Sequence, residues 1–277
     1  MKYKMVVSDF DWTLGNSPDF IEESTVKTIR EYEKKGGIFT VCTGRLYSSV
    51  ATILRKHGFH GYVIACQGAI IADIDTGERI YSDGIKTPLA AKAVRALRAD
   101  GHTVLLDYDD RLCYTESTPY TDAYERLAGI SGYVRQDLAA FIEEGNVTVQ
   151  KIMVMCEERD LQGILEKYGK LFAGKLLVNS GSKNLVEIVS ADCSKGISTR
   201  HLAERYGVRP EEVLAVGDST NDLSLTEQGF HSVAVGDGSE KLRAAADEVT
   251  VPYAEKPVET LLKKYCLSAD SSLEQSR

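Results

Sequence analysis

Residues 3–13, YKMVVSDFDWT, decide the fold that the sequence predicts. The first six of them, residues 3–8, form a short stretch that contains β-branched residues and is almost continuously apolar. Such a stretch is typical of a strand buried on both faces of a parallel sheet. The strand ends at Asp9, and Asp11 follows two residues later. Side chains at that spacing in an extended chain point to the same side. The stretch therefore predicts a buried strand that brings two carboxylates to one place, although an Asp-rich turn would also contain them.

Strands and helices alternate on both sides of a central segment. Towards the N-terminus we expect strands at 3–8, 38–42 and 62–66, helices at 24–35 and 48–56, and a hairpin of 70–74 with 78–81. Towards the C-terminus we expect helices at 196–206, 223–228 and 240–246, and strands at 213–216 and 232–235. Alternation of this kind predicts βαβ units in a doubly wound, mostly parallel sheet.

The central segment has a different pattern. It contains four strand-like stretches, at 103–108, 112–115, 149–156 and 175–179, and helical stretches at 88–99 and 160–168. Several strands with two or three helices predict an α+β insert with an antiparallel sheet. The predicted fold class is therefore α/β, with a core at 1–83 and 189–267 that is interrupted by an inserted domain at 84–188. The polar tail, 268–277, is expected to be mobile.

Composition narrows the function classes. A chain of 277 residues corresponds to about two domains. Its 41 acidic and 33 basic residues give a net charge of −8, which argues against nucleic acid or an anionic membrane as a partner. Six isolated cysteines, no long apolar run and no visible export leader predict a reduced, cytoplasmic protein. We make no prediction of its oligomeric state.

A second motif, Thr43-Gly44-Arg45, lies between a predicted strand and a predicted helix. A hydroxyl and backbone N–H groups at such a junction form a cradle for an anion, and glycine allows close approach. Alone, the tripeptide is also explained by a turn or a helix cap.

The third motif is the run from Gly217 to Asp222, GDSTND, which also follows a predicted strand. Oxygen ligands such as Asp218, Asn221 and Asp222 suit a hard cation like Mg²⁺, although a turn would have the same composition. Lys195 would be a surface charge if it stood alone. However, three motifs at three strand ends predict one shared site, because ligands of open α/β sheets bind at that edge.

Taken together and in order, these motifs resemble those of the haloacid dehalogenase superfamily. The position and length of the insert resemble the α/β cap of its Cof-type phosphatases, the class with a IIB cap. The resemblance covers both ends of the chain and most of its length.

The resemblance implies a role for each matching residue. Asp9 would attack phosphorus and become an aspartyl phosphate, while Asp11 would act as acid and base. Mg²⁺ would bind Asp9, the Asp11 backbone carbonyl and Asp218. Asn221 and Asp222 would support the metal or the lysine. Thr43, Gly44 and Lys195 would contact the phosphoryl group. Thr13 would orient the first loop, and Arg45 would contact the substrate or brace the cap.

The chain departs from the family pattern at Trp12, where glycine is usual, and at Gln67, which replaces an asparagine. We expect Trp12 to pack under its loop, and the alternatives are that it restricts the loop or closes against the cap. Specificity would come from the cap, where the basic candidates are Arg111, Lys151, Lys175 and Lys183.

The leading hypothesis is thus a Mg²⁺-dependent phosphatase that acts on small phosphorylated metabolites, such as sugar phosphates. Two alternatives remain open at this point. A phosphomutase of the same superfamily would pass the phosphoryl group to a second hydroxyl, and a non-enzymatic switch would hold a stable phosphoaspartate.

Overall fold

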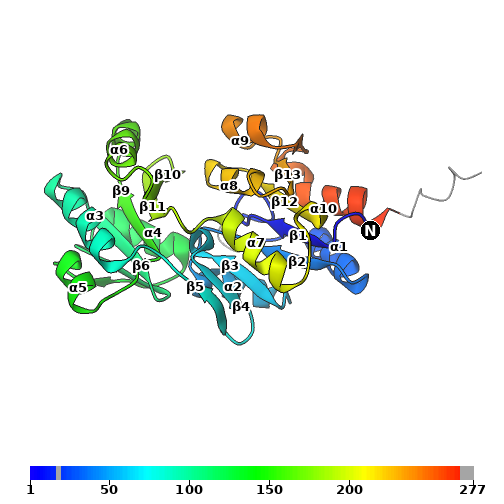
Figure 1. The fold of residues 1–277 in the computed structure, drawn as a ribbon, viewed down its shortest axis with the longest axis horizontal. Helices are drawn as coiled ribbons and strands as arrows, with labels where there is room; N and C mark the ends of the chain where they lie inside the picture. The colour runs from blue at the N-terminus through cyan, green and yellow to red at the C-terminus, as the bar shows by residue number, and fades with distance from the viewer. Residues whose placement is uncertain (17–19, 269–277) are drawn as a thin grey trace, which may run out of the picture.

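The structure is a computed structural model that describes residues 1–16 and 20–268. The chain forms two lobes that lie side by side (Figure 1). One lobe, the core, is built on a five-stranded parallel sheet in the order β14-β13-β12-β1-β2. The other lobe, the cap, is built on a six-stranded sheet in the order β10-β11-β9-β6-β7-β8. This arrangement confirms the predicted fold class.

The core sheet is built from both ends of the chain. The sheet contains β1 (Met5–Ser8), β2 (Ile38–Val41), β12 (Val213–Gly217), β13 (His231–Ala234) and β14 (Glu248–Val249). The helices around it are α1 (Glu23–Lys34), α2 (Tyr47–Lys56), α7 (Lys195–Arg205), α8 (Leu223–Thr226), α9 (Glu240–Ala245) and α10 (Pro257–Leu262). A small antiparallel sheet of β3 (Tyr62–Ala65), β4 (Ile70–Asp73) and β5 (Arg79–Ser82) adjoins it through one parallel bridge, Cys42 to Ile64.

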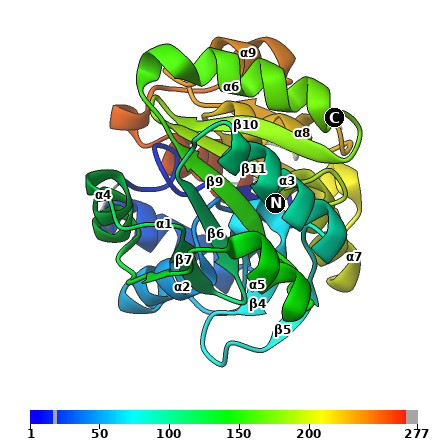
Figure 2. The same cartoon turned by 90° about the vertical axis from the view of Figure 1, so that its left-hand side faces the viewer.

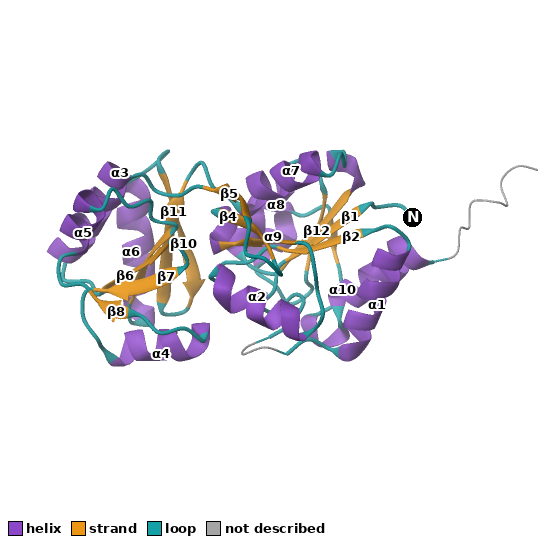
Figure 3. Ribbon diagram, turned by 90° about the horizontal axis from the view of Figure 1, so that it is seen from below, coloured by secondary structure: helices purple, strands orange, loops and turns teal. Residues whose placement is uncertain are grey.

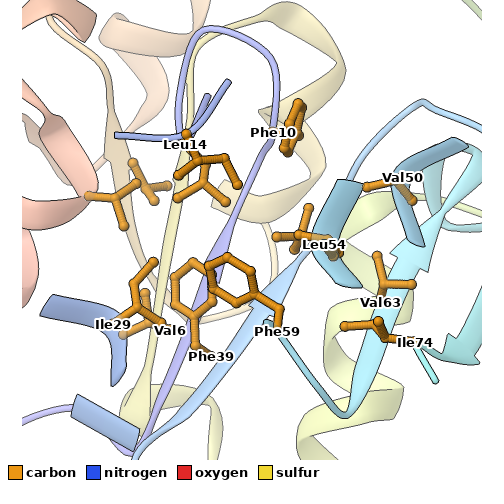
Figure 4. Close-up of a cluster of buried hydrophobic side chains, with 14 of the residues drawn as sticks. Val6, Phe10, Leu14, Ile29, Phe39, Val50, Leu54, Phe59, Val63 and Ile74 are labelled. Atoms are coloured by element: carbon orange, nitrogen blue, oxygen red, sulfur yellow. The ribbon is translucent and has the colours of Figure 1, made fainter. Parts of the chain in front are cut away.

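The alternation of side chains along β1 explains how helices cover both faces of the core sheet. Val6 belongs to a buried cluster with side chains of α1, α2 and α10. Met5 and Val7 point to the other face and belong to a cluster with α7 and α8. Figure 4 shows the first cluster, in which Val6 lies near Ile29 and Phe39. Strand β1 is apolar at successive positions because both of its faces are buried.

The chain between β5 and α7 forms the cap. Its strands are β6 (Val104–Tyr108), β7 (Arg111–Tyr114), β8 (Tyr133–Val134), β9 (Lys151–Met155), β10 (Leu176–Ser182) and β11 (Leu185–Ser190). Its helices are α3 (Thr87–Ala99), α4 (Pro119–Ala128), α5 (Leu138–Glu144) and α6 (Glu158–Leu171). Figures 2 and 3 show α3, α5 and α6 on the side of the cap strands that is turned away from the core.

The two faces of the cap sheet differ in character. One face packs against α3, α5 and α6 through residues such as Leu106 and Val154. The other face carries Leu105 and Met153, which pack against α4 in a smaller cluster. Because side chains alternate along a strand, Lys151 lies on this second face with Met153. Lys151 therefore lies on the face of the cap sheet that is turned towards the core.

Several elements were not predicted. The structure has four helices in the cap where two or three were expected, because α4 and α5 were missed. Both begin with a side-chain cap, from Thr118 and Asp137 respectively. Strand β11 and helix α10 were also missed. The predicted domain bounds at 84 and 188 stay predictions, and β11 continues to Ser190. Apart from Ser268, the tail at 268–277 lies outside the described residues.

In the described part of the chain, none of the helices combines the length and the apolar run that a membrane crossing requires.

Candidate active site

The loops that carry the sequence motifs meet at one edge of the core sheet. Strands β12, β1 and β2 are parallel neighbours, so their carboxyl ends lie together. Asp9 follows β1, Thr43 follows β2 and Asp218 follows β12. Lys195, the first residue of α7, reaches the same place. The prediction of one shared site at this edge agrees with this geometry.

Lys195 connects two of the loops. Its Nζ donates to Asp9 Oδ1 at 2.7 Å and to Asp222 Oδ1 at 2.8 Å, and its side chain is fully buried. Burial lowers the pKa of this ammonium, but the Asp222 and Asp9 carboxylates outweigh burial and raise the pKa above its ordinary value. Lys195 is therefore held in the charged form.

Local structure fixes where Lys195 lies. Ser194 caps α7, because its Oγ accepts the Ile197 N–H at 3.2 Å. Gly196 allows α7 to approach the chain near α8, since a Cβ at this position would lie 2.0 Å from the Ser224 carbonyl oxygen. Position 196 therefore requires glycine, because any side chain there would clash with the chain at Ser224.

Asp222 organises the third loop. Its Oδ2 accepts the backbone N–H groups of Asp218 and Ser219, both at 3.0 Å. Gly217 is required beside it, because a Cβ there would lie 2.3 Å from Asp222 Cγ. Thr13 Oγ1 donates to Asp218 Oδ1 at 3.2 Å and so connects the first and third loops.

Three carboxylates gather around the lysine. Ligand oxygens of Asp9, Asp218 and Asp222 all lie within 4.8 Å of one another. Burial raises the pKa of Asp9 well above its usual range, although Lys195 opposes the shift. Burial, followed by the charge of Asp222, raises the pKa of Asp218 to about 6. A site that resists its own negative charge favours a bound cation.

The donor set fits a hard divalent cation. All three acids offer oxygen, the ligand type that Mg²⁺ prefers. Asn221 adds a buried Oδ1 that has no hydrogen-bond partner among the described residues. The two oxygens of Asp222 already accept hydrogen bonds from Lys195 and the loop backbone, so Asp9 and Asp218 are the acids better placed to bind a metal.

Asp11 lies beside this cluster but pairs with a different group. Arg45 donates to both of its oxygens, from Nε at 2.9 Å and from Nη2 at 2.6 Å. The Arg45 guanidinium also lies over the Phe10 ring, 4.7 Å from its centre. Thr43 Oγ1 accepts the Arg45 N–H at 3.2 Å. The bidentate contact between Arg45 and Asp11 fixes the direction of the Asp11 carboxylate.

A cleft of about 280 Å³ separates this cluster from the cap. The core contributes residues from all three motif loops, and the cap contributes residues from α4, β9, β11 and the end of β10. Lining residues from the core are Asp9, Asp11, Trp12, Thr43, Gly44, Arg45, Leu46, Ser49, Gln67, Asp218, Ser219 and Asn221. Lining residues from the cap are Tyr124, Ala128, Lys151, Gly181, Ser182, Leu185 and Glu187.

The expectation that Trp12 packs under its loop is wrong. The residue is 57% exposed and lines the cleft. Its backbone adopts φ +60°, and its ring meets the Tyr253 ring edge to face at 5.5 Å. The side chain therefore points out of the loop, into the cleft between the core and the cap.

One of the four basic cap candidates lines the cleft, namely Lys151. Its ammonium donates to Glu187 Oε1 at 2.7 Å and to the carbonyl oxygen of Gly44 at 3.0 Å. Glu187 in turn accepts Gln67 Nε2 at 2.6 Å. Lys151 thereby connects the cap to the loop that follows β2, and Glu187 connects it to the turn that follows β3. The other three candidates are exposed: Arg111, Lys175 and Lys183.

Sequence reasoning missed Glu187, Tyr124 and Asp107, the further members of this cap cluster. Asp107 and Lys151 are directly opposite each other on β6 and β9, and their charged atoms are 3.4 Å apart. A signal was present, because each of three otherwise apolar strands contains one charged residue: Asp107, Lys151 and Glu187. A lone charge in such a strand indicates a polar partner on the same face. The pairing of strands that are distant in sequence was not available.

Comparison with known proteins agrees with this geometry. The family description "haloacid dehalogenase-like hydrolase" matches residues 6–262 of the chain. The phosphatase YwpJ of Bacillus subtilis is 26% identical over 288 residues, which cover 94% of this chain and 99% of that protein. A chloroplastic endoribonuclease YBEY of Arabidopsis thaliana is 23% identical over 278 residues, and the chain, covered to 95%, spans 47% of its length.

Among solved structures, the subclass IIB sugar phosphatase BT4131 superposes with a TM-score of 0.80 at 19% identity. The superposition covers 95% of this chain and 98% of that one. At this identity the likeness concerns the fold, which includes both the core and the cap.

Proposed function

The chain belongs to the haloacid dehalogenase-like hydrolases and is a phosphatase, and we propose that it hydrolyses small phosphate monoesters through an aspartyl phosphate on Asp9. The observation that carries this proposal is the position of Asp9. Its carboxylate accepts a hydrogen bond from a buried lysine and lies within 4.8 Å of two further carboxylates, at the bottom of a cleft. A carboxylate in that position suits attack on a phosphate ester, whose charge the lysine and a cation stabilise.

The residues present fit Mg²⁺, which Asp9 and Asp218 would hold together with the Asp11 backbone carbonyl. When bound, the cation would supply positive charge to the phosphoryl oxygens. Asn221 and Asp222 support this site. Asp222 orders the loop of Asp218 through two backbone N–H groups, and the buried Asn221 Oδ1 is left for a partner outside the chain.

The reaction uses groups of the chain itself in two steps. Asp9 forms a bond to phosphorus while the ester P–O bond breaks, and the leaving oxygen takes a proton from Asp11. Asp11 then accepts a proton from the water that attacks the phosphoaspartate, which restores Asp9 and releases phosphate. Arg45 fixes the direction of the Asp11 carboxylate through two hydrogen bonds, which suits Asp11 as the base of the second step. For the first step Asp11 takes up a proton from solvent before it serves as the acid.

Phosphoryl oxygens meet a second group of donors. Lys195 contacts Asp9 directly, and Thr43 and Gly44 line the same cleft as Asp9. A Cβ at Gly44 would lie 2.4 Å from Gln67 Nε2, so a larger residue there would displace the Gln67 amide from its contact with Glu187. We assign these three residues to binding the phosphoryl group, which is the main task in phosphoryl transfer.

Small phosphorylated metabolites, sugar phosphates among them, are the proposed substrates. A cleft of about 280 Å³ with both charged and apolar walls supports this size and chemistry. We also propose that the enzyme works in the reducing cytoplasm, since all six cysteines are buried as free thiols.

The test is a phosphate-release assay on p-nitrophenyl phosphate and a panel of sugar phosphates, with and without Mg²⁺. We expect turnover that depends on Mg²⁺, and a hydroxylamine-sensitive phosphoryl label on Asp9 in samples quenched during turnover. Full activity in Asp9→Asn, or a label on another residue, contradicts the proposal. Recovery of an isomerised sugar phosphate without free phosphate would identify a mutase instead.

A further inference from the structure

Trp12 is the only tryptophan of the chain. Its surroundings give no reason why the stability of the fold would require a tryptophan there. More than half of the side chain, 57%, is exposed, so its burial stabilises the fold little. Its φ of +60° lies in the left-handed region, which costs a non-glycine residue roughly 1 kcal/mol and which glycine adopts freely. A large aromatic side chain at such a position, inside the loop of Asp9 and Asp11, points to a function.

The indole is held in place although it is exposed. The backbone N–H of Trp12 donates to the Gly15 carbonyl oxygen at 2.8 Å, which closes the loop that carries the side chain. The Tyr253 ring lies against it at 5.5 Å with an angle of 77° between the planes. An edge-to-face contact of this kind restrains one side of an aromatic ring and leaves other surface open.

The open surface belongs to the cleft that also contains Asp9 and the cap residues Lys151 and Glu187. A phosphate ester with its phosphorus at Asp9 has its leaving group between the first loop and the cap. The cap side offers charged hydrogen-bonding groups, and Trp12 offers an apolar ring. A cyclic leaving group with hydroxyls at its rim and an apolar face matches both walls.

We infer that Trp12 is a specificity-determining residue, whose indole stacks on the ring of the leaving group and selects cyclic over open-chain phosphate esters. This inference rests on the proposed phosphatase function and adds to it a class of substrate. An open-chain polyol of the same size makes the same hydrogen bonds with the cap but presents no flat face to the indole.

Glucose 6-phosphate and sorbitol 6-phosphate are the matched substrates, because they carry the same phosphate and differ in the ring. In Trp12→Ala the ratio of their kcat/KM values should fall roughly fivefold to tenfold, the size expected for a lost aromatic contact. Trp12→Phe keeps a ring and should retain the ratio within about twofold. Tyr206→Ala removes an exposed aromatic side chain that does not line the cleft, and should leave the ratio unchanged.

Trp12→Gly is the control for a change in loop conformation, which alanine could cause at this backbone position. Glycine adopts the left-handed backbone without strain. Trp12→Gly should lower the ratio as much as Trp12→Ala does. If either variant lowers kcat/KM equally for both esters, or leaves both unchanged, the inference is wrong.

A binding experiment separates this inference from the proposed function. With a single tryptophan in the chain, the emission of Trp12 can be followed directly in the inactive variant Asp9→Asn. Glucose 6-phosphate should change the emission, whereas inorganic phosphate and sorbitol 6-phosphate should change it much less. Equal responses to all three ligands overturn the inference. Failure of the wild-type protein to release phosphate from any ester overturns the proposed function, while the emission still decides the role of Trp12.

Discussion

Each lobe contains a buried lysine that is surrounded by carboxylates, and the two clusters differ in how much negative charge remains unbalanced. In the core, Lys195 has three acids around it, Asp9, Asp218 and Asp222. In the cap, Lys151 has two, Glu187 at 2.7 Å and Asp107 at 3.4 Å. We call these groups the core cluster and the cap cluster.

The two clusters balance their charges in different ways. The core cluster has two negative charges in excess of its lysine when all three acids are ionised, and its carboxylates share a site that suits a divalent cation. The cap cluster has one in excess, and burial raises the pKa of Asp107 to about 6, so a proton can balance it. The core cluster is therefore suited to chemistry with a metal, and the cap cluster to holding the two lobes together through Gly44 and Gln67.

The largest effect should come from the same substitution made once in each cluster. Asp9→Asn removes the proposed nucleophile and should lower kcat by at least about 10³-fold, as removal of a covalent catalyst does. Asp107→Asn should leave kcat within about twofold, because Asp107 does not line the cleft. Steady-state release of phosphate measures both. Comparable losses in the two variants would show that the clusters do not differ in function.

Replacing each lysine should separate stability from catalysis. Lys195→Met and Lys151→Met each leave buried carboxylates without their cation, and each should lower the free energy of unfolding by about 3–5 kcal/mol. Lys195→Met should in addition lower kcat by about 10²-fold to 10³-fold, which is far more than Lys151→Met should. Unfolding in urea and phosphate release measure the two quantities.

The double variant Lys151→Met with Glu187→Gln controls for the unpaired charge, and should recover part of the stability that Lys151→Met loses. If the losses of stability in the two single variants simply add in the double variant, the ion pair between Lys151 and Glu187 does not contribute to stability. A loss of kcat in Lys151→Met as large as that in Lys195→Met would remove the distinction between the clusters.

The sequence indicated where two acids of the core cluster lie, because Asp9 and Asp218 follow strand ends, whereas Lys195 was singled out only by the family resemblance. A run of apolar residues such as those around Val6 identifies a buried parallel strand, and the residue after it must lie at the edge where ligands bind. Asp9, Thr43 and Asp218 could each be placed in this way without knowledge of any contact between them.

The cap cluster was not predicted, because its geometry depends on strand pairing. Lys151 and Glu187 are 36 positions apart, and only the register of β9 with β11 brings them to one face. Helix α4 was missed although Thr118 and Pro119 form a readable helix start. The outward direction of Trp12 depends on φ, which a single residue in a loop does not reveal.

The raised pKa of Asp107 gives the cap cluster a dependence on pH. Burial is the main cause, with Lys151 opposing it and Glu187 and Asp110 adding to it. Between the ordinary pKa of 3.8 and about 6, the folded chain holds a proton that the unfolded chain has lost. The free energy of unfolding therefore falls as pH rises through this window, by roughly 3 kcal/mol in total for this group.

Asp107→Asn should remove that cost, because an amide resembles the protonated acid. Relative to wild type, the variant should gain stability between about pH 4 and about pH 7 when unfolding in urea is compared at the two values. Other buried carboxylates titrate in both proteins and cancel in the difference. Asp192→Asn, at an exposed acid, is the matched control and should follow the wild-type curve. Parallel curves for Asp107→Asn and wild type contradict the prediction.

Addition of Mg²⁺ should act on the core cluster alone. A ligand that binds only the folded chain stabilises it by about 2.7 kcal/mol at a hundred times its Kd. Wild type should show a stabilisation of this order in urea unfolding, and Glu187→Gln in the cap should show the same increment. Asp218→Asn should show little, because the change removes a proposed metal ligand together with part of the negative charge that attracts the cation.

The same comparison predicts a reversal of order. Without Mg²⁺, Asp218→Asn relieves the repulsion among three buried carboxylates and should be at least as stable as wild type. With Mg²⁺, wild type should become the more stable protein. NaCl at equal ionic strength must not reproduce this, since screening acts on any charge whereas a bound cation needs the oxygen ligands of Asp9 and Asp218. An equal response to both salts would mean that the negative charge of the core cluster is balanced by its lysine and by protons, as in the cap.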